Sequence, residues 1–233
     1  MITQLPLDLK LNDAATFANF YHTDSGVVFH LQSIADDPRG EFIFLCGPEG
    51  VGKSHLLQAI CWKARLQNRA VFYLDTAQFS GTLTAVHPDE MLESVECSDI
   101  IAFDGIDVIA QNLTWETALF HAFNRLRDAG KTLLIAGKLP PSLLAFQLPD
   151  LKSRLTAGVV YQLIPPNDAG KIKILQWRAT QRGLEINNEV AQYIVTHYSR
   201  DLTQLVHLLD QLDQVSLMHQ RKITIPFLKE FAR

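Results

Sequence analysis

Hydrophobic residues in this chain follow two patterns. Short unbroken apolar runs are typical of strands buried on both faces of a parallel sheet, whereas apolar residues at every third or fourth position are typical of amphipathic helices. The unbroken runs predict five strands, at residues 42–45, 70–74, 98–104, 132–137 and 159–163. The helical pattern lies between them, most clearly at residues 55–66 and 115–129, with shorter stretches at 25–34, 91–95 and 148–155. This alternation predicts an α/β fold with a parallel five-stranded sheet covered by helices on both faces.

The pattern changes after the Pro-Pro-Asn-Asp run at residues 165–168. From there on it is entirely helical and predicts helices at residues 168–182, 188–198, 201–220 and 226–232. Asn187, Asn188 and Asp201 stand where helix N-caps are expected. The sequence therefore predicts an α/β domain over residues 13–165 and a small all-helical domain over residues 166–233.

Residues 1–12 do not follow the helical pattern. Pro6 interrupts them, and leucines alternate with other residues on either side of it. Two interpretations stay open on this pattern alone: an edge strand or ordered tail, or an extended peptide that docks into pockets on another protein.

Composition and charge narrow the class of protein. The chain has 233 residues, of which 47% are hydrophobic and 20% charged, as in an ordinary globular protein. Its net charge of −4 gives no general attraction for nucleic acid, so little direct DNA binding is expected. A solvated helix face is the preferred interpretation of four basic residues, with direct DNA contact as the alternative: Lys171, Lys173, Arg178 and Arg182. Neither a leader peptide nor a membrane-spanning apolar stretch is recognised, which favours a cytoplasmic protein that does not enter membranes.

The three cysteines show no C-x-x-C spacing and sit in apolar runs. They are predicted to be buried free thiols in a reducing compartment.

Residues 47–54 form the strongest motif, a complete G-x-x-x-x-G-K-[ST] phosphate loop between a predicted strand and a predicted helix. Glycines let the backbone turn tightly and aim N–H groups inward, and the helix N-terminus adds a positive dipole end. Lys53 supplies a charge for the β- and γ-phosphates, and the Ser54 hydroxyl can bind Mg²⁺. The predicted nucleotide-binding residues are Gly47, Pro48, Glu49, Gly50, Val51, Gly52, Lys53, Ser54 and His55.

Asp104 ends the third predicted strand and is the second candidate Mg²⁺ ligand, with Ser54. An Asp at the carboxyl end of a strand holds Mg²⁺ directly or through water in phosphate-loop proteins. The alternative is a side chain that caps the next turn, since Gly105 follows. Asp107 is a weaker second candidate.

Several motifs together resemble the AAA+ class of ATPases and, within it, bacterial replication initiators of the DnaA type. They are residues 16–20 (Thr-Phe-Ala-Asn-Phe), the phosphate loop, Asp104, residues 139–141 (Leu-Pro-Pro), 151–155 (Leu-Lys-Ser-Arg-Leu) and 199–202 (Ser-Arg-Asp-Leu). The resemblance covers nearly the whole chain. It implies an AAA+ domain followed by a helical lid.

Two departures make the chain similar to the DnaA-homologous regulators of replication initiation. It ends soon after the lid, without the helix-turn-helix domain that an initiator uses on origin DNA. Its N-terminus resembles the peptide that docks on the sliding clamp of DNA polymerase III, the β clamp, through Gln4, Leu5, Leu7 and Leu9. On this resemblance, clamp docking is the preferred interpretation of residues 1–12.

The resemblance implies a negative regulator that holds ADP or ATP with Mg²⁺, binds the clamp and provokes hydrolysis of the ATP bound to the initiator DnaA. Arg154 matches the arginine finger for that task, and Arg200 matches the second sensor, an arginine that reaches the subunit's own nucleotide from the lid. The alternative for Arg154 is an ion pair with Asp150 or a nearby carboxylate, and for Arg200 a surface ion pair.

Other family positions depart from the pattern. Gly105 stands where a second acid is usual, and Lys138 stands at the first sensor, which is usually a smaller polar residue. The chain's own hydrolysis is therefore expected to be weak or absent. The competing interpretations are a helicase loader or remodelling ATPase with its own turnover, and a small-molecule kinase. Self-association is left open.

Overall fold

The structure is a computed structural model that describes residues 15–20, 25–79, 87–199, 201–219 and 223–231. These residues form two compact units, which join between Leu163 and Ile164. Each unit has its own hydrophobic core. Among the described residues, no helix has both the length and the apolar surface to cross a membrane.

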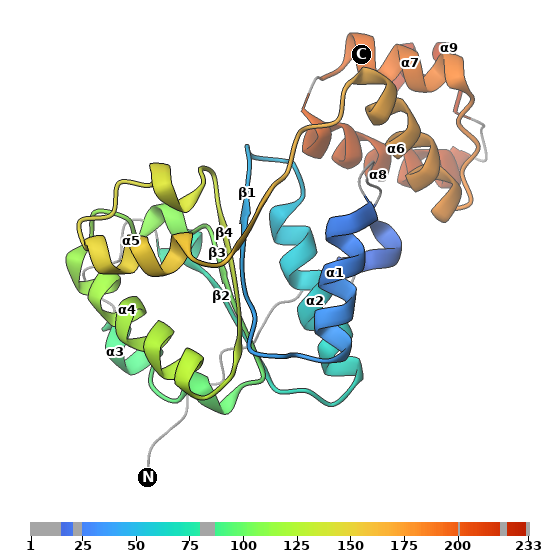
Figure 1. The fold of residues 1–233 in the computed structure, drawn as a ribbon. Coiled ribbons are helices and arrows are strands. Elements are labelled where there is room, and N and C mark those ends of the chain that lie inside the picture. Colours follow the sequence, from blue (N-terminus) through green and yellow to red (C-terminus); the bar gives the residue numbers. More distant parts are fainter. Residues whose placement is uncertain (1–14, 21–24, 80–86, 200, 220–222, 232–233) are drawn as a thin grey trace. The chain divides into compact units, whose positions relative to one another are not determined.

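The first unit is built on a sheet of five parallel strands in the order β2-β3-β4-β1-β5, which confirms the predicted α/β class (Figure 1). The strands are β1 Phe42–Cys46, β2 Val71–Asp75, β3 Ile100–Asp104, β4 Thr132–Gly137 and β5 Val159–Gln162. Every residue of β3 and β4 is buried, because both strands lie inside the sheet and have helices on both faces. Continuous apolar runs are the sequence pattern that such burial requires.

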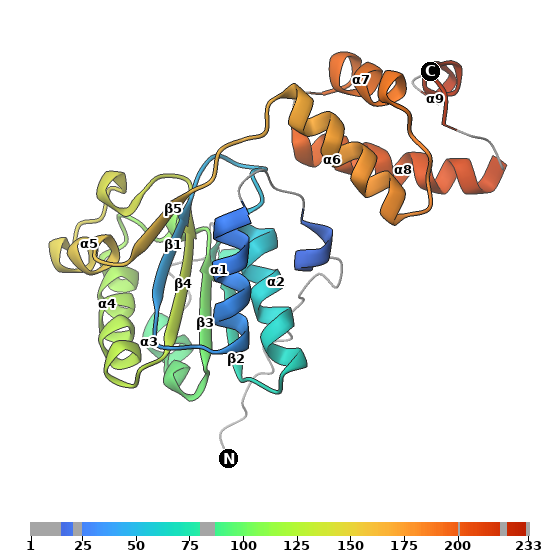
Figure 2. The same cartoon turned by 45° about the vertical axis from the view of Figure 1, so that its right-hand side comes forward.

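Helices cover both faces of this sheet (Figures 1 and 2). On one face lie α1 Ser25–Asp36 and α2 Lys53–Leu66, and on the other lie α3 Pro88–Met91, α4 Leu113–Asp128 and α5 Pro149–Thr156. Alternate residues of β1 enter the two cores: Ile43 and Leu45 pack with α1 and α2, and Phe44 packs with α4. The 3-10 helices of this unit are Phe17–Asn19, Thr76–Phe79, Val95–Cys97, Ile106–Val108 and Pro141–Leu143.

The region before β3 differs from the predicted helix at residues 91–95. Helix α3 ends at Met91, and a separate 3-10 helix covers Val95–Cys97. Ser94, at the start of that second turn, has a left-handed backbone with φ of 63°, which an α-helix cannot contain. Cys97 lies on the surface, so the prediction of three buried thiols is wrong for it, whereas Cys46 and Cys61 are buried.

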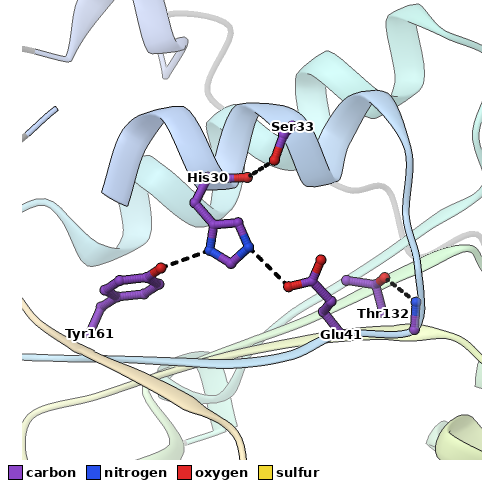
Figure 3. Close-up of polar contacts among 6 residues, drawn as sticks. His30, Ser33, Glu41, Thr132 and Tyr161 are labelled. Atoms are coloured by element: carbon purple, nitrogen blue, oxygen red, sulfur yellow. Dashed lines mark hydrogen bonds and ion pairs between the residues drawn. The ribbon is translucent and has the colours of Figure 1, made fainter. Parts of the chain in front are cut away.

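Strand β5 forms one edge of the sheet, and its side chains are largely exposed. A side chain from α1 reaches it (Figure 3): His30 lies with Nδ1 2.7 Å from the hydroxyl of Tyr161 and Nε2 2.9 Å from Oε2 of Glu41. Helix α1 is thereby tied both to the edge strand and to the residue just before β1.

The second unit consists of helices around a separate apolar core. Its helices in the described residues are α6 Asp168–Gln181, α7 Asn188–His197, α8 Leu202–His219 and α9 Ile225–Phe231. Side chains cap three of them, as Asn167 accepts from Gly170 N, Asn187 from Val190 N and Asp201 from Gln204 N. Two of the three predicted caps are confirmed. Asn188 is instead the first helical residue of α7.

Candidate functional site

The phosphate loop connects the carboxyl end of β1 to the first residue of α2. Strand β1 ends at Cys46, and the helix begins at Lys53. Gly52 precedes the helix with φ of 100°, and no side chain caps this helix end. The N–H groups of the first turn of α2, and the positive end of its dipole, are the donors that an anion can use there.

Lys53 points back over the start of the loop. Its Nζ donates hydrogen bonds of 2.7 Å to Gly47 O and 2.8 Å to Pro48 O. Burial lowers the pKa of Lys53 below its ordinary value. The carboxylates of Asp104, Asp107 and Glu49 oppose this change in the pKa of Lys53, because they favour the ammonium form.

Asp104 lies at the carboxyl end of β3 and is buried. Its Oδ2 accepts a 2.8 Å hydrogen bond from the hydroxyl of Tyr73 in β2, which in turn accepts from Gln58 Nε2 at 3.2 Å. Ser54 also donates to the carboxylate, so the two predicted Mg²⁺ ligands are hydrogen-bonded neighbours. Burial raises the pKa of Asp104, and the hydrogen bonds from Ser54 and Tyr73 oppose that shift.

Gly105, directly after Asp104, has a left-handed backbone with φ of 73°. A Cβ atom placed on it would lie 3.3 Å from Oγ1 of Thr76. Thr76 is itself buried, and its hydroxyl lies 2.8 Å from Asp104 O and 2.5 Å from Gly105 O. A side chain at position 105 would therefore be strained both by its backbone and by Thr76.

The turn after β4 meets the phosphate loop through charged residues. Both carboxylate oxygens of Asp107 accept from the backbone N–H of Lys138, at 2.9 and 2.8 Å. The Nζ of Lys138 lies 2.5 Å from Oε1 of Glu49, in the middle of the phosphate loop. Asp107, a weaker metal candidate in the sequence, thus holds the backbone of this turn. The pairing of Glu49 with Lys138 was missed, because no local pattern joins residues so far apart in the chain.

Residues 16–20 lie beside the start of α2. His55 Nε2 is 2.8 Å from Thr16 O, and the rings of His55 and Phe20 are 5.3 Å apart. A Cβ atom on Gly52 would meet the Phe20 ring at 2.5 Å, so only glycine allows this close packing. The structure therefore brings together the first family motif and the phosphate loop.

The residues at this site fit the phosphates of a nucleotide with Mg²⁺. An uncapped helix N-terminus and Lys53 are the donors that phosphate oxygens require, and Ser54 with Asp104 offers one hydroxyl and one carboxylate. Mg²⁺ is commonly held by one or two such protein ligands together with substrate phosphates. Among the described residues, no group of three or more His, Cys, Asp or Glu side chains is arranged to hold a metal without such phosphates.

Arg154 lies elsewhere, in the last turn of α5, on the sheet face opposite α1 and α2 (Figure 1). Within the described part of the chain its guanidinium makes no ion pair or side-chain hydrogen bond, so the alternative ion pair with Asp150 is not present. The start of α5 is fixed by Glu116 of α4, a fully buried residue whose Oε2 accepts from Leu148 N at 2.7 Å and whose Oε1 accepts from Gln111 N at 2.8 Å.

Five of the predicted site residues lie outside the described residues. They are the clamp-peptide positions Gln4, Leu5, Leu7 and Leu9, and the lid residue Arg200.

Most of the chain matches two known protein families. Residues 11–162 match the family described as the bacterial DnaA ATPase domain, and residues 168–231 match the family described as the Hda lid domain. An uncharacterized protein of Haemophilus influenzae is 38% identical over 232 residues, which are 99% of this chain and 98% of that protein.

Solved structures of other proteins resemble this chain in fold. Domain III of the replication initiation protein DnaA from Thermotoga maritima aligns with a TM-score of 0.78 and 25% identity, over 93% of this chain and 94% of that one. DnaA from Aquifex aeolicus bound to AMPPCP aligns at 0.72 and 23%, over 87% and 67% of the two chains. The Thermotoga maritima RuvB branch migration motor aligns at 0.64 and 16%, over 89% and 68%. The last two show the fold.

Proposed function

Since the chain belongs to the bacterial DnaA family of AAA+ proteins and carries a lid of the Hda type, we propose that it is a negative regulator of replication initiation that acts on the initiator DnaA. In this proposal the chain binds a nucleotide, ADP or ATP, with Mg²⁺ at the phosphate loop. It docks on the β sliding clamp of DNA polymerase III through residues 1–12. It then stimulates hydrolysis of the ATP held by DnaA.

The observation that carries this proposal is the state of Arg154. Arg154 is half-buried and has no ion-pair or hydrogen-bond partner for its guanidinium among the described residues, which supports its binding an anion on another molecule. An arginine finger stabilises the charge that develops on the phosphoryl group in the transition state, and such residues contribute about 10³–10⁵ in rate in other nucleotide hydrolases. Glu116 accepts a hydrogen bond from Leu148 N at the start of α5, and Leu151 and Leu155 of that helix are fully buried, so the helix that carries Arg154 packs against the domain core.

The residues at the chain's own nucleotide site favour nucleotide binding over nucleotide hydrolysis. The hydrogen bond between Ser54 and Asp104 supports a Mg²⁺ site there, and Lys53 beside the carbonyl of Gly47 supports phosphate binding. The position after Asp104 is Gly105, where a side chain would be strained, and no acid stands there to orient an attacking water. Lid residue Arg200 is proposed to contact this nucleotide, which would link the lid to the bound state.

The test is phosphate release from ATP-loaded DnaA, measured with and without this protein and the DNA-loaded clamp. We expect stimulation that is lost in Arg154→Ala and is not restored by Arg154→Lys, because lysine lacks the planar fork of donors. Arg127→Ala is the matched control, since Arg127 is exposed on α4 and pairs with the adjacent Asp128. Full stimulation by Arg154→Ala would overturn the proposal.

Clamp docking has a separate test. The double substitution Gln4→Ala with Leu5→Ala is expected to abolish binding to immobilised clamp and to remove the clamp-dependent part of the stimulation. Retained binding would exclude the N-terminal peptide as the docking element. Vigorous ATP turnover by the isolated chain would instead favour a loader or remodelling ATPase.

A further inference from the structure

The carboxylate of Asp104 is held from the neighbouring strand, β2. Tyr73 of β2 faces Ala102 of β3 in the parallel register, and Asp104 follows Ala102 by two residues, on the same face of the sheet. Because the side chain of Ala102 is small, it leaves room for the ring of Tyr73 to reach Asp104, to which the hydroxyl donates at 2.8 Å. Both side chains are buried, so the contact is shielded from water.

The direction of the Tyr73 hydroxyl is fixed as well. A phenol has one proton to donate, and Nε2 of Gln58 donates to the same oxygen at 3.2 Å. Gln58 therefore occupies the acceptor side of that oxygen, and the proton is left for Asp104. Burial, with the nearby charge of Asp104, raises the pKa of Tyr73, so the hydroxyl remains a donor at neutral pH.

The backbone of Asp104 is held from the same end of β2. The buried hydroxyl of Thr76, in the turn that follows β2, lies 2.8 Å from Asp104 O. Side chains from one strand end thus bond both the carboxylate and the carbonyl of Asp104. The rotation of this carboxylate is restricted before any cation binds.

We propose that Tyr73, with its hydroxyl oriented by Gln58, is a positioning residue for Mg²⁺ at the phosphate loop: it fixes the rotation of the Asp104 carboxylate, so that the ion bound with a nucleotide meets a ligand already in place. This inference rests on the nucleotide-binding part of the proposed function. A carboxylate that was free to rotate would lose that freedom when the ion binds, and this loss would lower the affinity for the ion. Residues that hold a metal ligand without touching the metal typically contribute about 10–100-fold in metal affinity.

The test is binding of ADP to the full chain by calorimetry, over a series of Mg²⁺ concentrations and in EDTA. Tyr73→Phe removes the hydroxyl and keeps the ring. The Mg²⁺ concentration that gives half of the Mg²⁺-dependent gain in affinity should rise about tenfold. The affinity in EDTA should change less than about twofold, because the phosphate loop itself is unaltered. A merely structural role of Tyr73 would instead weaken ADP binding equally in both conditions.

Gln58→Met is a second variant, which leaves Tyr73 in place but no longer orients its hydroxyl. We expect the Mg²⁺ requirement to rise less, about threefold, as for loss of one neutral hydrogen bond. Adding Gln58→Met to Tyr73→Phe should cause no further rise, since both act through one hydroxyl. Tyr161→Phe is the matched control: it removes the hydroxyl that bonds His30 at the edge of the same sheet (Figure 3), and it should leave the Mg²⁺ dependence unchanged.

The outcomes separate this inference from the proposed function. An unchanged or lower Mg²⁺ requirement in Tyr73→Phe, or equal losses with and without Mg²⁺, would overturn the inference and leave the proposed regulator intact. Additive effects in the double variant would overturn the orienting role of Gln58. If the unaltered chain bound ADP equally well in Mg²⁺ and in EDTA, or not at all, the inference and the corresponding part of the proposed function would fall together.

Discussion

The hydroxyl of Tyr73 donates a 2.8 Å hydrogen bond to Asp104, and this pair links the second strand of the sheet to the candidate magnesium site. The bond compensates a buried carboxylate for part of the water that it has lost. Gln58 of α2 donates to the same hydroxyl, so helix, strand and carboxylate form one chain of hydrogen bonds. Burial of the charged carboxylate of Asp104 lowers the stability of the protein when no cation balances the charge.

The first prediction concerns that cost. Asp104→Asn keeps an acceptor for Tyr73 but removes the buried charge, so the nucleotide-free protein should become more stable. At pH 8 without Mg²⁺ we expect the melting temperature to rise by about 2–4 °C, which corresponds to about 1 kcal/mol in a chain of this size. Asp37→Asn, an exposed residue that pairs with Arg39, is the control and should give no gain. Calorimetry should also show that Asp104→Asn removes the Mg²⁺ dependence of nucleotide binding.

The second prediction concerns Gly105. Gly105→Ala forces a side chain into the left-handed region and against Thr76, and should lower the free energy of unfolding by about 1–2 kcal/mol. Gly130→Ala is the matched control, since Gly130 has φ of 64° but nothing within 4 Å of its Cβ position. Urea denaturation should show the larger loss for Gly105. Equal losses would mean that Thr76 adds no constraint.

The third prediction separates the position of Arg154 from its chemistry. Glu116→Gln puts an NH₂ group against one of two backbone N–H donors, which should cost about 2–3 kcal/mol and loosen the start of α5. Arg154→Ala removes no intramolecular contact in the described residues and should leave stability within about 0.5 kcal/mol. Both variants should reduce stimulation of DnaA, but denaturant unfolding should detect only the first. A stable Glu116→Gln protein would contradict this account.

The fourth prediction is a pH dependence at the opposite end of the sheet. A hydrogen bond from Ala70 N, with help from Lys131, lowers the pKa of Asp99. A carboxyl whose pKa is lowered by folding adds stability above its unfolded pKa, near 3.9, and loses it as the pH falls through the folded value. Asp99→Asn should therefore be less stable than the unaltered chain at pH 7, and the gap should close below about pH 4. Urea midpoints at both pH values test this, with the exposed Asp37→Asn as the control.

The elements that sequence predicts well here are those whose burial is continuous. Strand β4 is buried at all six positions, and its apolar run predicts a strand even when the neighbouring strands are unknown. Residues 91–95 are different, because a backbone reversal at Ser94 decides the local structure and no hydrophobic period signals it. Cys97 was mispredicted for the same reason, since it belongs to that irregular segment.

Within the site, the sequence predicts the residues of the loop and Asp104, because contiguous motifs carry them. It does not predict Tyr73, Thr76 or Glu116, whose roles depend on which strands and helices become neighbours. Once the order β2-β3-β4-β1-β5 is known, Tyr73 and Asp104 must lie on adjacent strands. Long-range pairs of this kind are a property of topology, which one sequence does not reveal.

The last prediction concerns His30 (Figure 3). Its ring bonds Tyr161 on one side and Glu41 on the other, and so joins α1 to the edge strand and to the entrance of β1. Strand β5 has few buried side chains of its own, so this bridge adds to the backbone pairing with β1 that holds it. His30→Ala should lower the free energy of unfolding by about 1–3 kcal/mol, through two lost hydrogen bonds.

Phe29 provides the control, because it is the neighbouring residue of α1 and its side chain is 75% exposed. Phe29→Ala should change stability by less than about 0.5 kcal/mol. Amide hydrogen exchange locates the effect: in His30→Ala, protection should fall first in β5 and at the next residue, Leu163, whose N–H donates to Cys46 O just before the phosphate loop. If the amide of Leu163 exchanges faster, nucleotide affinity should fall as well, because the hydrogen bond from Leu163 to Cys46 connects the edge strand to the start of the phosphate loop. Loss of stability with unchanged protection in β5 would refute the bridge as the support of this edge.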